Sequence, residues 1–144
     1  LASWSAVNMV AGTALSFSAE DDVAVAFHRM NAGWNIVNAA LAVPSLFAAR
    51  NALDSGTSLT FSESLLAQNR LEDILLFNAG IDFAYIAAGF YLTERARRGG
   101  PDAATLTGFG RSLMLQGSFL LAFDLTIYAL QRRVGRGITG LADQ

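Results

Sequence analysis

Long apolar stretches separated by short polar turns divide the chain into four segments. Turn signals fall at residues 18–22 (SAEDD), residues 50–59 (RNALDSGTSL) and residues 99–102 (GGPD), and no alternating strand pattern is found. The pattern predicts an all-α protein, with long apolar segments at about residues 2–18, 27–49, 70–95 and 104–131. We expect one helical domain over residues 1–144.

Local signals mark where the helices begin and end. The acids of residues 20–22 suit the first turn of the second helix, where the helix dipole favours negative charge. Thr60 and Glu63 have the spacing of a capping box for the third helix. Residues 99–102 supply glycines after that helix, and Asp102 is the expected N-cap of the fourth. The fourth helix is predicted to end near Arg133, before a Gly-rich tail.

The faces of these helices are arranged for lipid. A soluble bundle helix is charged on the face away from the core. Here that face is uncharged; on the third segment it carries Leu76, Phe77, Gly80, Phe83, Ala84, Ala87 and Tyr91. Apolar outer faces and polar inner faces are what a bilayer requires. We therefore predict an antiparallel bundle of four transmembrane helices; residues 1–19 lack a basic n-region and are interpreted as a structural helix, not a signal peptide.

Polar side chains recur at helical spacing and are expected to meet inside the bundle. A buried Asp costs about 3 kcal/mol on the insertion scale, so such groups need partners. Asn8 repeats the pattern on the first helix within the fragment W-x-x-V-N, which recurs at residues 34–38. The candidate ligand- or ion-binding residues are His28, Asn31, Asn35 and Asn38 on the second helix, Asn78, Asp82 and Tyr85 on the third, and Gln116, Asp124 and Tyr128 on the fourth.

The polar interior admits several functions. Asn and Gln are common helix–helix contacts, each hydrogen bond contributing about 0.5–2 kcal/mol. The protein would then be non-enzymatic, binding a small polar ligand or ion or serving as a subunit of a larger assembly. Alternatively, Asp82 and Asp124 bind a proton or cation coupled to transport, which would require a dimer because four helices make thin walls. A third alternative is an enzyme acting on a lipid head group near His28 and Arg111.

Composition narrows the chemistry. Hydrophobic residues make up 53% of the chain and charged residues 15%, against about 25% in ordinary soluble proteins. No basic block exists that could follow a phosphate backbone, so nucleic acid is not an expected partner. The chain has no cysteine and one histidine, which excludes thiolate sites, multi-histidine metal sites and bis-histidine haem. No catalytic residue, metal site or cofactor is predicted; the expected partners are the bilayer and a homo-oligomer or larger membrane complex.

Three motifs resemble those of a family of small bacterial four-helix membrane proteins of unknown function. The first is H-x-M-N-x-x-W-N-x-x-N at residues 28–38, the second is Asp82 on the third helix, and the third is Q-G-x-F-L-x-x-F-D at residues 116–124. The resemblance covers most of residues 3–131. It implies a shared fold with an interior polar network and a bacterial inner-membrane location, but no activity. Membrane orientation stays undecided, because the arginines divide equally between the two sides.

Overall fold

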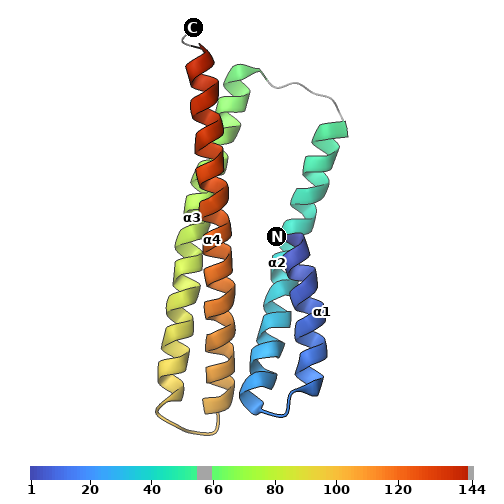
Figure 1. Cartoon of the computed structure of the whole chain (residues 1–144), viewed down its shortest axis with the longest axis vertical. Coiled ribbons are helices and arrows are strands. Elements are labelled where there is room, and N and C mark those ends of the chain that lie inside the picture. The colour runs from blue at the N-terminus through green and yellow to red at the C-terminus, as the bar shows by residue number, and fades with distance from the viewer. Residues whose placement is uncertain (55–59, 143–144) are drawn as a thin grey trace. The chain divides into compact units, whose positions relative to one another are not determined.

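The described part of the chain forms four α-helices. The computed structural model describes residues 1–54 and 60–142. These form α1 (Ala2–Ser18), α2 (Asp22–Asp54), α3 (Phe61–Ala96) and α4 (Ala103–Ala142) (Figure 1). The described residues contain no strand, so the predicted all-α class is confirmed.

The predicted helix starts are present. At the start of α2, the Asp21 carboxylate accepts a hydrogen bond from the backbone N–H of Ala24 at 3.0 Å. At the start of α3, the Thr60 hydroxyl accepts from the Glu63 N–H at 3.4 Å and the Glu63 carboxylate accepts from the Thr60 N–H at 2.9 Å. This reciprocal pair is the predicted capping box. In the turn between α3 and α4, Gly99 and Gly100 have backbone φ angles of 78° and 115°. Residues with a side chain rarely adopt such positive φ angles.

Two helices run further than the sequence pattern indicated. The prediction that the fourth helix ends near Arg133 is wrong, because α4 continues to Ala142. Glycine costs a helix only about 1 kcal/mol per residue, and packing can outweigh that cost. In this region the Gln68 amide of α3 lies against Gly135 and donates to the backbone oxygen of Gln131 at 2.8 Å. Likewise, α2 continues to Asp54, so the first residues of the loop predicted at residues 50–59 are helical. Residues 55–59 of that predicted loop lie outside the described residues.

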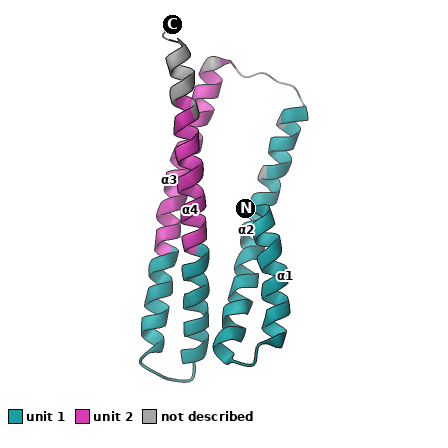
Figure 2. Ribbon diagram, viewed as in Figure 1, with its two compact units in different colours: residues 1–57, 85–116 teal, residues 58–84, 117–144 magenta. Residues whose placement is uncertain are grey.

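The helices divide between two compact units (Figure 2). Unit 1 comprises residues 1–57 and 85–116, which include α1, α2 and the parts of α3 and α4 next to the Gly99–Gly100 turn. Unit 2 comprises residues 58–84 and 117–144, which include the remaining parts of α3 and α4.

Small residues allow close helix contacts within unit 1. A Cβ atom added to Gly12 of α1 would lie 3.1 Å from the Cβ atom of Ala32 on α2. A Cβ atom added to Gly108 of α4 would lie 2.6 Å from the backbone nitrogen of Phe27 and 2.7 Å from the Cβ atom of Ala26. The backbones of α2 and α4 therefore approach more closely than any side chain at position 108 would permit, as is common at helix contacts in membranes.

The burial pattern is inverted relative to a soluble protein. The largest fully buried side chains are all polar: Gln116, Asn35, Ser5 and Ser112. Large apolar side chains are exposed, among them Phe17 (84%), Val10 (73%), Phe77 (71%) and Phe83 (66%). The predicted outer face of α3 is therefore exposed, with its apolar residues outward. Water would make such a surface costly, whereas hydrocarbon would not.

Three of the described helices are long and apolar enough to cross a membrane. The candidate spans are Asp22–Asn51, Ser62–Ala96 and Ala103–Arg133, with 30, 35 and 31 residues. Between 12% and 22% of the residues in their most apolar windows are buried inside the protein, so most of each window faces outward. Length, composition and exposure together indicate an integral membrane protein.

We expect Gly108→Ala to destabilise the protein, because its methyl group would collide with the α2 backbone. Overpacking of this kind costs about 1–3 kcal/mol. Gly80→Ala is the matched control, because a Cβ atom there meets nothing within 4 Å. The free energy of unfolding in mixed detergent micelles should fall for Gly108→Ala and stay equal or rise for Gly80→Ala. Equal effects of the two substitutions would contradict the close contact.

Candidate functional site

Four hydrogen bonds form a closed circuit in the core of unit 1. The Trp4 indole N–H donates to Oε1 of Gln116 at 3.1 Å, and the Gln116 amide nitrogen donates to Oδ1 of Asn31. The Asn31 amide donates to Oδ1 of Asn8 at 2.8 Å, and the Asn8 amide donates to the backbone oxygen of Trp4 at 2.9 Å. We call these four residues the amide circuit. It joins α1, α2 and α4 without using an ionised group.

Burial makes the amide circuit important for the packing of unit 1. Gln116 is fully buried and Asn31 is 5% exposed. An amide without a partner in such a place would cost several times what a satisfied one contributes. Each interhelical bond in a membrane protein contributes about 0.6 kcal/mol on average and up to about 1.7 kcal/mol. The circuit thus fixes which faces of the three helices meet.

Three buried oxygen atoms close to the circuit lack hydrogen-bond partners among the described residues. They are Oγ of Ser5, Oδ1 of Asn35 and Oγ of Ser112, and each residue is fully buried. The Asn35 amide nitrogen, by contrast, donates to the backbone oxygen of Asn31 at 2.8 Å. Ser5 is next to Trp4 in the chain, and Ser112 lies one helical turn before Gln116. These three oxygen atoms in the core of unit 1 therefore have no described partner, whereas the amide circuit beside them is hydrogen-bonded.

The remaining predicted residues of α2 and Tyr85 of α3 lie outside the circuit. The Trp34 and Tyr85 rings pack edge to face with centroids 4.7 Å apart, and the buried Trp34 N–H has no described partner. His28 is half-buried, with its ring edge-on to Phe27 at 5.2 Å. Asn38 is 6% exposed, and its amide nitrogen has no described partner.

Unit 2 contains a separate buried pair of carboxyl groups. Asp82 of α3 is 4% exposed and Asp124 of α4 is 8% exposed, and the two interact electrostatically. The Asn78 side chain is a hydrogen-bond partner of Asp124, whereas Oδ2 of Asp82 has no partner among the described residues. Tyr128, further along α4, accepts a hydrogen bond from Arg132 at 3.4 Å. Within residues 1–54 and 60–142, no three His, Asp or Glu side chains gather closely enough to hold a metal ion.

The structure thus brings together six of the ten predicted residues, in two groups, and leaves His28, Asn38, Tyr85 and Tyr128 outside them. Asn31 and Gln116 meet in the amide circuit, with Asn35 beside it, and Asn78, Asp82 and Asp124 meet in unit 2. Sequence analysis missed Trp4, Ser5 and Ser112 as parts of the interior. A signal was present: Ser5, Asn8 and Gly12 follow helical spacing, as do Gly108, Ser112 and Gln116.

A family model decides the relationship of this chain to other proteins. The model of the family of unknown function DUF6992 matches residues 1–125. The chain belongs to DUF6992. The match includes the amide circuit, Asp82 and Asp124, and the expected resemblance to a family of unknown function is confirmed. DUF6992 itself indicates no activity. Searches of the curated proteins and of the solved structures found no match.

The amide circuit predicts energetic coupling between Asn31 and Gln116. In a double-mutant cycle with Asn31→Ala and Gln116→Ala, we expect a coupling energy of about 0.6–2 kcal/mol in the free energy of unfolding. The control cycle pairs Asn31→Ala with Thr107→Ala, because Thr107 donates within its own helix to Ala103. That control should be additive. Additivity in both cycles would contradict the circuit.

Proposed function

We propose that this DUF6992 protein is a non-enzymatic integral membrane protein of four spans whose interior binds a small polar ligand or ion. The observation that carries the proposal is the Asp82 carboxyl group, which is buried on α3 with one oxygen unpartnered among the described residues. The proposed location is a bacterial inner membrane, whose lipid surrounds the helices. The protein is also proposed to form a homo-oligomer or to be part of a larger membrane complex.

The proposal treats α1 as a fourth span. Its 17 residues extend about 26 Å, which is at the short end of the range for helices that cross a bilayer. It contains no charged residue, and its outward side chains include Val7, Val10 and Phe17. On its inner face, the circuit residues Trp4 and Asn8 bind α4 and α2. These observations support a helix surrounded by lipid on one face and by α2 and α4 on the other.

Single-cysteine labelling tests the fourth span directly, because the chain has no cysteine of its own. Ser3 lies in the first turn of α1 and Glu20 follows its last turn, and both residues are exposed. We expect a membrane-impermeant maleimide to label Ser3→Cys and Glu20→Cys from opposite sides of the membrane. Asp102→Cys, in the turn between α3 and α4, should label from the same side as Glu20→Cys. Labelling of both α1 positions from one side would show that α1 does not cross.

The chemistry of Asp82 supports an ion as the occupant of the interior. A buried carboxylate without compensation is far too costly to persist, so it must hold a proton or a cation. Asn78 and Asp124 add oxygen atoms nearby, which are the ligands that alkali and alkaline-earth cations prefer. Helix packing alone would be satisfied by amides, as the circuit of unit 1 shows, and needs no ionisable group.

Asp82→Asn tests the ion site, with the exposed Asp73→Asn on the same helix as the matched control. A cation that binds only the folded protein raises stability by about 2.7 kcal/mol at a hundred times its dissociation constant. We expect sodium or calcium chloride, against choline chloride, to raise the unfolding temperature of wild type and Asp73→Asn but not of Asp82→Asn. A bound proton would instead show as a pH response of stability that Asp82→Asn alone lacks. Identical responses of Asp82→Asn and wild type to salts and pH would refute the site.

Ion-coupled transport by a dimer is the second candidate function, and the same buried carboxyl pair favours it. In proteoliposomes loaded with a pH-sensitive dye, proton flux by wild type that Asp82→Asn abolishes would support transport. Flux that is unaltered by this substitution would count against it. The lipid head-group enzyme is less favoured, because the described residues lining the cleft that contains Arg111 do not include His28.

A further inference from the structure

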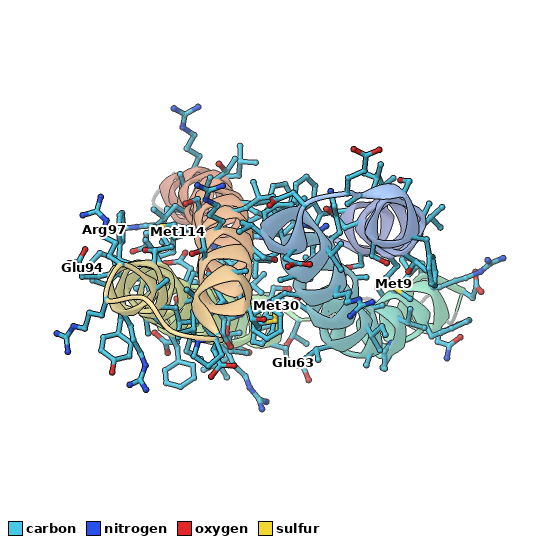
Figure 3. All side chains as sticks on the ribbon, turned by 90° about the horizontal axis from the view of Figure 1, so that it is seen from below. Met9, Met30, Glu63, Glu94, Arg97 and Met114 are labelled. Carbon is cyan, nitrogen blue, oxygen red and sulfur yellow. The ribbon has the colours of Figure 1, made fainter. Side chains whose placement is uncertain are left out.

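An open cleft lies between α3 and α4 in unit 1, at the end of the two helices next to the Gly99–Gly100 turn. Its volume is 660 Å³. Figure 3 shows Glu94 of α3, and Arg97 just after the end of α3, close to Met114 of α4 on this side of the protein. The lining residues are Phe90, Thr93, Glu94, Ala96, Arg97, Thr107, Arg111 and Met114.

The two guanidinium groups are the hydrogen-bond donors that this cleft offers to a ligand. The hydroxyl groups of Thr93 and Thr107 already donate to backbone oxygens of their own helices, at 2.9 and 2.8 Å. Arg97 lies 3.2 Å from the Glu94 carboxylate, but both side chains are mostly exposed, so this ion pair contributes little. Arg111 has no ion pair among the described residues. A planar guanidinium matches a phosphate group in geometry as well as charge.

The depth of these residues matches the surface of a bilayer. Arg111 lies about 12 Å along α4 from its start at Ala103, and its side chain leans toward that start, as side chains on helices do. Arg97 directly follows the end of α3. Phe90 and Met114 line the deeper part, on the side of the hydrocarbon core. The arginine side chains of the cleft thus lie at the level of the membrane surface, and its apolar side chains lie toward the hydrocarbon core.

We propose that this cleft binds the phosphate head group of an anionic membrane phospholipid. The Arg97 and Arg111 guanidiniums hold the phosphate, and the first part of an acyl chain lies against Phe90 and Met114. A free phosphate ion would use the arginines alone and leave the apolar lining unexplained. The net charge of the cleft, with two arginines and Glu94, is positive and favours an anionic over a zwitterionic lipid. The inference rests on the membrane location of the proposed function but not on the ion site of unit 2.

Lipid binding to the delipidated full chain in detergent, followed by native mass spectrometry, tests the proposal. We expect one phosphatidylglycerol to bind more tightly than phosphatidylcholine. Arg111→Gln should weaken phosphatidylglycerol binding about tenfold, the effect of losing one charge-assisted hydrogen bond. Arg98→Gln is the matched control, because it removes the same charge at the same end outside this cleft and should leave binding unchanged.

Further variants keep the test decisive if Arg111→Gln fails to fold. Arg97→Gln should also weaken binding, and Glu94→Gln should strengthen it, because it removes the carboxylate that competes for Arg97. Equal binding of the two lipids, or an Arg98→Gln loss as large as that of Arg111→Gln, would overturn the proposal. Loss of lipid binding in excess sodium phosphate would reassign the cleft to free phosphate. Recovery of the chain in the soluble fraction without detergent would instead refute the membrane location, which distinguishes the two failures.

Discussion

The need of buried polar groups for partners inside the protein shapes this structure, and the few groups that lack a described partner stand out against it. In hydrocarbon no water is available to satisfy an amide or a carboxyl group, so the helices must present their polar residues to each other. The amide circuit meets this requirement with neutral groups alone and holds three helices in one register. Around it, close contacts such as Gly108 against α2 bring the backbones near enough for short side chains to reach across. Because the polar side chains face one another, the apolar side chains are left on the outer faces of the helices, where they can contact lipid.

The polar clusters described in unit 1 and unit 2 differ in how their buried side chains are satisfied. Unit 1 uses Asn, Gln and Trp, whose hydrogen bonds form a circuit, and unit 2 uses a pair of carboxyl groups. Amides that are buried together can satisfy one another, because each of them donates and accepts. Carboxyl groups cannot satisfy each other in this way without a proton or another cation between or beside them. The polar residues of unit 1 therefore fit a role in helix packing, whereas the carboxyl pair of unit 2 fits the ion binding proposed for Asp82.

Periodicity and end signals were enough to predict the four helices, the start of the second at residues 20–22 and of the third at Thr60, and the apolar outer faces. The C-terminal end of α4 could not be predicted, because the contact of Gln68 with Gly135 joins residues far apart in the sequence. Asn31 and Gln116 were predicted as interior residues, but not as each other's partners, since helical spacing gives a face and not the neighbour that meets it. Trp4 was missed for a related reason: an indole near a helix end is as typical of the membrane interface as of a buried hydrogen bond.

The amide circuit also has a direction. The indole of Trp4 can only donate and the backbone oxygen of the same residue can only accept, so the circuit begins and ends on groups that cannot exchange roles. Between them, the amides of Gln116, Asn31 and Asn8 are each compelled into a single one of their two flipped orientations. The indole and the backbone oxygen of Trp4 therefore set one direction for the hydrogen bonds across three helices, and the reversed order of donors and acceptors is closed to the protein.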